Sequence, residues 1–165
     1  MAPRTERDGY VLRAPADDAE WAAYHRIRRT ALFEQYHPEV VYDPKHPDEH
    51  KAENHPLVLI EDGTVIGTIR IDLFDAERAA FRIVAIDRDM QGQGHGTVLL
   101  KMAEDLVREA GRRKVVLHAN PANVAFYLRN GYREEAWEGD SALAEAVDMA
   151  KELSAPADPA IGARA

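Results

Sequence analysis

The chain has 165 residues, about the size of one domain, with 45% hydrophobic residues and a net charge of −8. It contains no cysteine, which excludes disulfides, thiolate metal sites and a cysteine nucleophile, and its acidic balance argues against general nucleic-acid binding. No stretch approaches the roughly 18 consecutive apolar residues of a membrane span, and the first residues lack the apolar core of a signal peptide, so we expect a soluble cytoplasmic protein.

The N-terminal third of the sequence predicts one short strand, one helix and one long loop. The first ten residues predict a loose lead-in, and "YVLRA" (10–14) predicts a strand. Asp17 and Glu20 have the spacing of a capping box, so we expect a helix from there to about residue 35, with "RIRR" (26–29) on its solvated face. Residues 36–56 hold four prolines and four histidines and predict a loop with one helical turn.

Histidine and acidic residues in this loop raise the question of a metal site. His46 and His50 lie four positions apart, with Asp48, Glu49 and His55 nearby. The pattern is not H-E-x-x-H, and the proline after His46 argues against a continuous helix through that residue. We therefore predict a solvated acidic loop and no metal.

The rest of the chain predicts a hairpin followed by alternating strands and helices. "LVLIEDGTVIGTIRIDL" (57–73) predicts a hairpin that turns at Asp62-Gly63, and "AAFRIVAI" (79–86) predicts a further antiparallel strand. A helix up to Gly111, a buried strand (114–119) and a helix from Pro121 to Gly131 follow, and "YREEAW" and "EAVDMAKEL" predict two closing strands. This order predicts one α+β domain over residues 1–153, with helices on both faces of a sheet, and a flexible tail over 154–165.

The segment "MQGQGHGT" (90–97) lies between an apolar run and a helical pattern. Glycine at every second position permits positive φ and close approach of a ligand to the backbone. A loop of this kind at the start of a helix directs unpaired N–H groups and the helix dipole toward one point, which suits a phosphate. A flexible turn is the alternative. A dinucleotide-binding G-x-G-x-x-G would need glycine at Thr97, and no G-x-x-x-x-G-K-[ST] loop is present.

Two blocks of the sequence resemble the GNAT superfamily of N-acetyltransferases. "VAIDRDMQGQGHG" is similar to the family's acetyl-CoA-binding motif in Gln91, Gly94 and Gly96. At the right distance, "NPANVAFYLRNGY" resembles a second family block in Asn120, Tyr127 and Gly131, with Tyr132 in place of the usual Phe. With the strand pair before them, the blocks extend the resemblance over about residues 10–151.

The resemblance implies a mixed, mostly antiparallel, twisted sheet of about six or seven strands, splayed at the acetyl-CoA-binding strand. It implies acetyl-CoA as co-substrate and direct transfer to an amine in a ternary complex. A main-chain N–H near Ile86 would polarise the thioester carbonyl. The cofactor-binding residues implied are Val84, Ile86, Gln91, Gly92, Gln93, Gly94, His95, Gly96, Thr97, Asn120 and Asn123.

The resemblance places Tyr127 at the family's general-acid position, where its phenol would protonate the leaving thiolate; packing, as for its neighbour Phe126, is the alternative. Arg82 stands where some members carry a glutamate that deprotonates the amine, and a charged arginine is not a base at neutral pH. Water, solvent or another residue would take that proton, the candidates being Glu34, His37, Asp43, Asp72 and His118. Arg82 would either bind an anionic group of the substrate or pair with Asp72 or Glu77.

These residues predict an N-acetyltransferase that acts on a primary amine of a small molecule. The alternatives are a catalytically weak acyl-CoA-binding or sensing domain and an acetyltransferase of a peptide or protein amine. The expected acceptor contacts are Arg82, Tyr36, Tyr42 and His118. Dimers are common in the family, so a homodimer is an option, whereas we expect no nucleic-acid or membrane partner.

Overall fold

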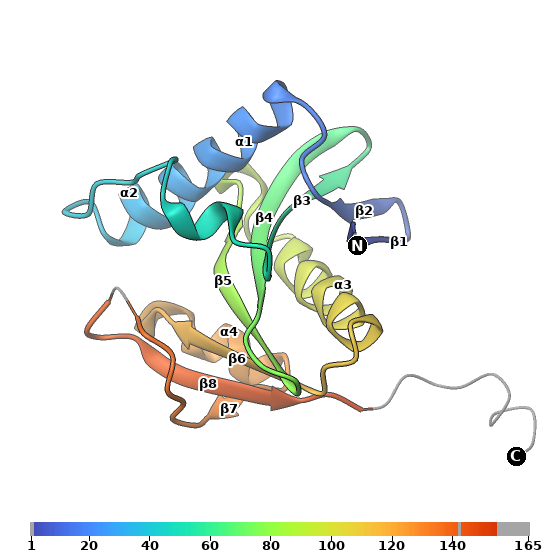
Figure 1. Ribbon diagram of the computed structural model, residues 1–165. Helices are drawn as coiled ribbons and strands as arrows, with labels where there is room; N and C mark the ends of the chain where they lie inside the picture. The colour runs from blue at the N-terminus through green and yellow to red at the C-terminus, as the bar shows by residue number, and fades with distance from the viewer. Residues whose placement is uncertain (1, 142, 155–165) are drawn as a thin grey trace, which may run out of the picture.

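One eight-stranded sheet runs through the computed structural model, which describes residues 2–141 and 143–154. The strand order is β1-β2-β3-β4-β5-β6-β8-β7, and only the β5–β6 pair is parallel (Figure 1). The strands are β1 (Arg4–Arg7), β2 (Tyr10–Arg13), β3 (Asn54–Glu61), β4 (Thr64–Leu73), β5 (Arg78–Ile86), β6 (Lys114–Ala119), β7 (Arg133–Glu134) and β8 (Val147–Glu152). The predicted α+β class is confirmed, with eight strands rather than six or seven.

The helical elements alternate with these strands. They are α1 (Asp18–Arg28), the π-helical η1 (Arg29–Phe33), α2 (Glu34–Tyr36), the short 3₁₀ turns η2 (Pro47–His50), η3 (Arg88–Met90) and η4 (Pro121–Asn123), and the helices α3 (His95–Glu109) and α4 (Val124–Arg129). Among the described residues, no helix is long and apolar enough to cross a membrane.

The expectation of a loose N-terminal lead-in is wrong. Residues Arg4–Arg7 form β1, which pairs with β2 through a tight turn at Asp8 and Gly9, both with positive φ. The strand escapes an analysis of hydrophobic pattern because its side chains are mostly charged and exposed, as is common on an edge strand.

The predicted first helix begins as expected but changes geometry before its end. The Asp17 side chain accepts a hydrogen bond from the Glu20 N–H at 2.8 Å. Glu20 does not complete the capping box; its carboxylate accepts from the Ala16 N–H and pairs with Arg13. The helix then passes into the π-helical η1 and ends with α2.

Alternate apolar residues of β3 face opposite sides of the sheet, and each side is covered by a helix. Leu57 and Leu59 belong to the main core, which includes the apolar side chains of α3. Val58 and Ile60 pack instead with Tyr24 of α1. Because neighbouring residues of a strand face opposite sides, α1 and α3 cover opposite faces, as Figure 1 shows on either side of β4.

The sheet opens between β5 and β6, as the resemblance implied. These strands pair only from Arg78↔Lys114 to Phe81↔Leu117, and beyond that point they diverge (Figure 1). On the other side of β5 the register with β4 shifts opposite Ile83, which has a φ of 52°. A β-branched residue rarely adopts this conformation, and an extra residue in one strand bends it. The bulge therefore turns β5 away from β6 and exposes an unpaired strand edge.

Most remaining elements follow the sequence. The hairpin turns at Asp62 and Gly63, both with positive φ, and β8 lies within its predicted segment. The strand predicted in "YREEAW" is limited to the two residues of β7. The predicted tail lies, apart from Ser154, outside the described residues, and the division of the chain into one domain and a tail stays a prediction.

Candidate active site

The glycine loop leads directly into the N-terminus of α3. Gly92 and Gly94 have φ values of 76° and 87°, and Gly94 caps the helix. The first hydrogen bond of the helix runs from the Val98 N–H to the Gly94 carbonyl, and none of the described residues accepts a bond from the amides of residues 91–97. These amides and the positive end of the helix dipole form a site for an anion.

This loop forms one wall of a cavity of about 710 Å³, here called the first cavity. The other walls come mainly from η1, α2, β5 and α4. Of the predicted cofactor-binding residues, the first cavity brings together Val84, Ile86, Gln91, Gly92, Gly94, His95, Gly96, Thr97 and Asn123. Gln93 is exposed in the same loop, and Asn120 lines a different cavity. The cofactor role of all eleven stays a prediction.

Three basic residues of the first cavity are absent from the sequence prediction: Lys101, Arg129 and Lys151. Lys151 donates to the buried Glu104 at 2.8 Å, whereas Lys101 and Arg129 make no ion pair with the described residues. Of these three residues, Lys101 could have been found from the sequence, because it lies about one helical turn after Thr97. Lys101 and Arg129 therefore add positive charge to the first cavity.

Tyr127 stands where the first cavity meets a second one. Asn120 caps η4 by accepting from the Ala122 N–H, and α4 then carries Tyr127 into the core, where its side chain packs edge-on against Phe126 and Tyr132. The residue is 7% exposed and lines both cavities. Burial raises the pKa of its hydroxyl above the ordinary value, so the phenol keeps its proton at neutral pH.

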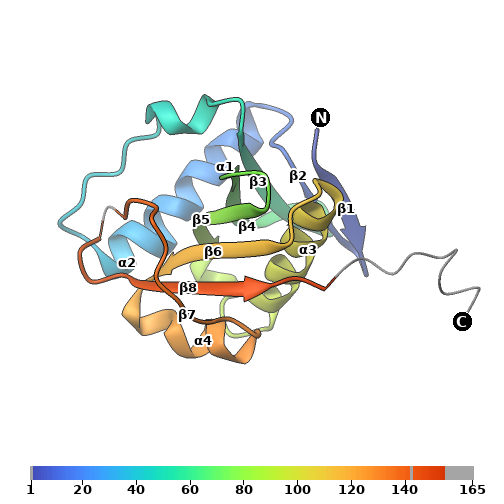
Figure 2. The same ribbon diagram turned by 60° about the horizontal axis from the view of Figure 1, so that its bottom comes forward.

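The second cavity, of about 770 Å³, lies on the α1 side of the open sheet. Figure 2 shows the segment between α2 and η2 and the segment before β8 on the same side of the molecule, and residues of both line this cavity. Three predicted acceptor contacts line it: Arg82, Tyr42 and His118. Tyr36 lines the first cavity instead. Of the candidate bases, His37, Asp43 and His118 line the second cavity, while Asp72 and Glu34 line neither.

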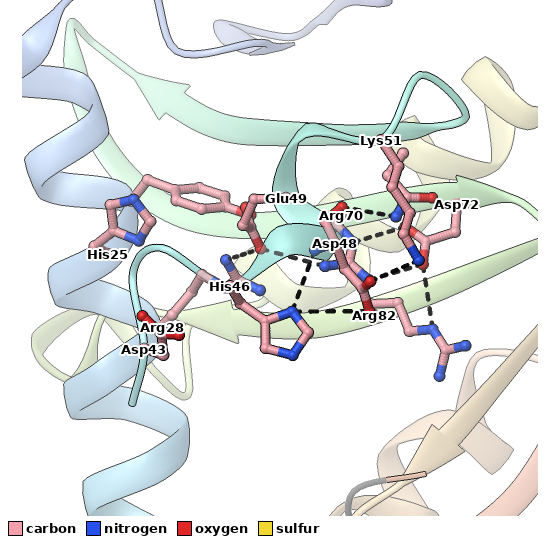
Figure 3. A network of polar contacts seen from close by, with 12 residues as sticks. His25, Arg28, Asp43, His46, Asp48, Glu49, Lys51, Arg70, Asp72 and Arg82 are labelled. Atoms are coloured by element: carbon pink, nitrogen blue, oxygen red, sulfur yellow. Dashed lines mark hydrogen bonds and ion pairs between the residues drawn. The ribbon is translucent and has the colours of Figure 1, made fainter. Parts of the chain in front are cut away.

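A buried ionic network lies under the second cavity (Figure 3). Glu49 reaches from η2 to Arg28 of α1 and to Arg70 of β4, and it accepts a hydrogen bond from the Tyr24 hydroxyl at 2.8 Å. Arg70 also donates two hydrogen bonds to Asp72, at 2.7 and 2.8 Å. The network ties η2 to α1 and to the sheet.

This network corrects two expectations. Arg28 and Glu49, which we assigned to a solvated helix face and a solvated loop, are both 2% exposed at their side chains. Burial opposes the ionisation of Glu49, but the guanidinium of Arg28, with help from Arg70, outweighs it and lowers the pKa of the carboxyl below its ordinary value. The side chains pair across 21 positions of sequence, which periodicity does not reveal.

Arg82 and His118 lie beside the opening of the sheet. The Arg82 Nε lies 3.4 Å from Asp72 Oδ2, and its Nη1 donates to the Asp140 carbonyl at 3.0 Å. Its ionic partner is thus one of the two that the sequence suggested. The His118 Nδ1 lies 2.8 Å from Asp148 Oδ1. Within residues 2–141 and 143–154, no group of three or more His, Asp or Glu side chains is arranged to hold a metal ion.

The chain is similar in sequence to proteins of one known family. A family model described as "Acetyltransferase (GNAT) family" matches residues 21–132. The uncharacterized protein YxbD of Bacillus subtilis (strain 168) is 29% identical over 99 residues, which span 58% of this chain and 57% of that protein.

Two solved structures share the fold. A putative N-acetyltransferase from Lactobacillus plantarum has a TM-score of 0.72 at 24% identity and covers 89% of this chain and 100% of its own. The PaiA N-acetyltransferase from Thermoplasma acidophilum, solved in complex with coenzyme A, has a TM-score of 0.69 at 16% identity and covers 88% of this chain and 100% of its own.

Proposed function

Because the chain belongs to the GNAT acetyltransferase family, we propose that it transfers an acetyl group from acetyl-CoA to a primary amine of a small molecule. One observation carries this proposal. Tyr127 lies at the junction of an anion-binding cavity and a second cavity of similar size, so a donor and an acceptor can meet at its hydroxyl.

The first cavity has the features that acetyl-CoA requires. The free amides of residues 91–97 can hold the pyrophosphate without a net charge, as helix N-termini commonly do. Lys101 and Arg129 add positive charge for the remaining phosphate. A structurally similar protein was solved with coenzyme A, which supports the choice of cofactor.

The open edge of β5 suits the thioester. Past Phe81 this edge has no partner on β6, so a main-chain N–H near Ile86 is free to donate to the thioester carbonyl. Such a donor is commonly worth about 10²–10³ in rate. The amine nitrogen then attacks the carbonyl carbon, the C–N bond forms as the C–S bond breaks, and the Tyr127 hydroxyl gives its proton to the departing sulfur. The same desolvation that raises the pKa of Tyr127 also disfavours a free thiolate, which favours this proton transfer.

The second cavity suits a cationic amine. Its carboxylates outnumber its guanidiniums: Asp43, Asp48, Glu49, Glu138 and Asp140 against Arg28, Arg70 and Arg82. Each of these arginines is paired with a carboxylate of the protein. Arg28 pairs with Glu49, and Arg70 and Arg82 pair with Asp72. Among the carboxylates, Glu49, Asp48 and Glu138 are also paired, with Arg28, Lys51 and Arg78 respectively. Asp43 and Asp140 form no ion pair with the described residues, and their negative charge attracts a protonated amine rather than an anion.

Thiol release from acetyl-CoA across a panel of amines tests the proposal. The panel includes diamines, amino sugars, amino acid esters and peptides with free N-termini. We expect turnover with at least one small amine, and a kcat about 10²-fold lower in Tyr127→Phe, the lower end of typical general-acid contributions. Affinity for acetyl-CoA, measured by calorimetry, should be unchanged because the aromatic ring keeps its packing. Turnover only with peptides would reassign the acceptor.

A catalytically weak acyl-CoA-binding domain is the second candidate. Arg82 at the position of the family's glutamate favours it, since no carboxylate stands there to deprotonate an amine. This candidate predicts that acetyl-CoA binds but that no amine in the panel accelerates thiol release.

A further inference from the structure

His118 occupies the point where the sheet opens. Phe81↔Leu117 is the last pair between β5 and β6, so His118 is the first residue of β6 without a partner on β5. Val116 packs with Ala80 and Trp137. His118, two positions later, faces the same side of the sheet, and it lines the second cavity.

Two contacts fix the His118 ring. Its Nδ1 lies 2.8 Å from Asp148 Oδ1 on β8, and the ring stacks on Trp137 with centroids 4.3 Å apart. Trp137 is itself fixed, because its indole N–H donates to the Leu117 carbonyl and its backbone N–H donates to the second carboxylate oxygen of Asp148. A carboxylate accepts only, so Nδ1 carries a hydrogen, and Nε2 is the nitrogen at which the ring gains or loses its second proton.

That second nitrogen is buried and has no partner. The His118 side chain is 8% exposed, and its Nε2 makes no hydrogen bond with any described residue. Since Asp148 holds Nδ1 on the β8 side, Nε2 is directed away from β8, toward the gap that opens beside β5. Buried polar atoms are normally paired, and an unpaired one in a cavity wall calls for a ligand or a reacting group.

Most other acid–base groups of this cavity are engaged. Glu49 contacts Arg28 and Arg70, Asp48 contacts Lys51, and Glu138 contacts Arg78. The His37 Nε2 bonds to the Asn120 side chain at 2.9 Å. Asp43 belongs to the exposed segment between α2 and η2, where it accepts from the Lys45 N–H. Of the described residues that line this cavity, His118 alone combines an unpaired nitrogen, a fixed ring and a position at the opening of the sheet.

We propose that His118 is the general base that takes the proton of the acceptor amine, directly or through one water molecule, and that Asp148 positions it. The bound ammonium group first loses one proton to solvent. As the neutral nitrogen then bonds to the acetyl carbon, its second proton passes to His118 Nε2, while the Tyr127 hydroxyl protonates the sulfur. The imidazolium then releases its proton to solvent, and the tyrosinate regains one, so the enzyme returns to its initial state. This inference rests on the proposed function and assigns the step that Arg82 cannot perform.

The test is chemical rescue with an amine that the wild type acetylates. His118→Ala should lower kcat about 10²-fold, as loss of a general base typically does, with acetyl-CoA affinity unchanged because His118 lies outside the first cavity. Added imidazole should restore at least a tenfold gain to His118→Ala and none to Tyr127→Phe. His55→Ala is the matched control, a half-buried histidine of β3 that lines neither cavity.

Asp148→Asn is the second variant, because it keeps the shape of the side chain if His118→Ala does not fold. It should lower kcat at least tenfold without changing the KM for acetyl-CoA. A kcat within threefold of wild type in either variant, or a His118→Ala loss that imidazole does not restore, overturns the assignment of His118 and leaves the acetyltransferase itself intact. A wild type with no turnover on any amine overturns the proposed function, and the inference with it.

Discussion

Glu49 shows how a single buried carboxylate supports the acceptor side of the protein. Its side chain joins a short turn, a helix and a strand, and its charge is matched by two guanidiniums. Removing one partner of a buried ion pair typically costs about 3–5 kcal/mol, because the remaining charge is left unpaired. We therefore expect Glu49→Gln to lower the free energy of unfolding by about 3 kcal/mol at pH 7, as measured by urea denaturation.

The pH dependence of this loss has a definite sign. The pKa of Glu49 is lowered in the folded protein, so its contribution is fully present above the ordinary glutamate pKa of about 4.3 and is lost as pH falls through the lower, folded value. The stabilities of wild type and Glu49→Gln should thus begin to converge as pH falls below about 4.3. Glu53→Gln is the control, because Glu53 is an exposed neighbour whose side chain makes no hydrogen bond or ion pair with the described residues, and it should change stability by less than about 0.5 kcal/mol. An equal difference between wild type and Glu49→Gln at pH 3 and pH 7 would contradict the account.

At the scale of single residues, the sequence indicated candidate site residues better than it indicated which charged side chains pair with one another. The motif drew attention to Tyr127 and the glycines because their spacing is local, and their roles stay a prediction. The burial of Arg28 and Glu49 was missed because opposite charges far apart in sequence carry no periodic signal. Lys101 and Arg129 were missed because a basic residue on a helix resembles a solvated face until the helix is placed beside a cavity.

Among the elements, the loop before α3 depends on the left-handed conformation of Gly94. A side chain there would cost about 1–2 kcal/mol or would rotate the amides that we propose to bind the pyrophosphate. We expect Gly94→Ala to weaken acetyl-CoA binding at least tenfold by calorimetry. Gly9→Ala is the matched control, since Gly9 has a φ of 88° against 87° and both positions have open space around them.

The two glycine variants should differ in one property only. Both should lose similar stability in thermal unfolding, but Gly9→Ala, in the β1–β2 turn, should bind acetyl-CoA as the wild type does. If Gly94→Ala bound the cofactor normally, the loop would not be the pyrophosphate site.

Elements with a strong pattern were predicted from sequence, and elements set by context were not. The hairpin at Asp62-Gly63, α3 and β6 combine periodicity with turn or cap residues, and each is where it was expected. The edge strand β1 and the π-helical η1 lack such signals. The bulge at Ile83 is a further case, because a β-branched residue gives no warning of positive φ. Only the splay of the sheet at this strand was expected, and it came from the resemblance.

At the scale of the whole molecule, two cavities that share Tyr127 lie beside an open sheet. The sequence located the cofactor half through two motifs and left the acceptor half to four residues, of which Tyr36 lines the other cavity. Acceptor recognition depends on loops whose course no local pattern specifies. The proposals for the acceptor cavity therefore depend on the proposal that the first cavity binds acetyl-CoA.

Calorimetric titration of the folded chain with acetyl-CoA tests this central claim most directly. The account predicts one site per chain with a Kd between about 1 μM and 1 mM, the usual range for enzyme substrates, weakened in Gly94→Ala and absent for ATP and NAD⁺. Heat with ATP or NAD⁺ and none with acetyl-CoA at millimolar concentration would contradict it.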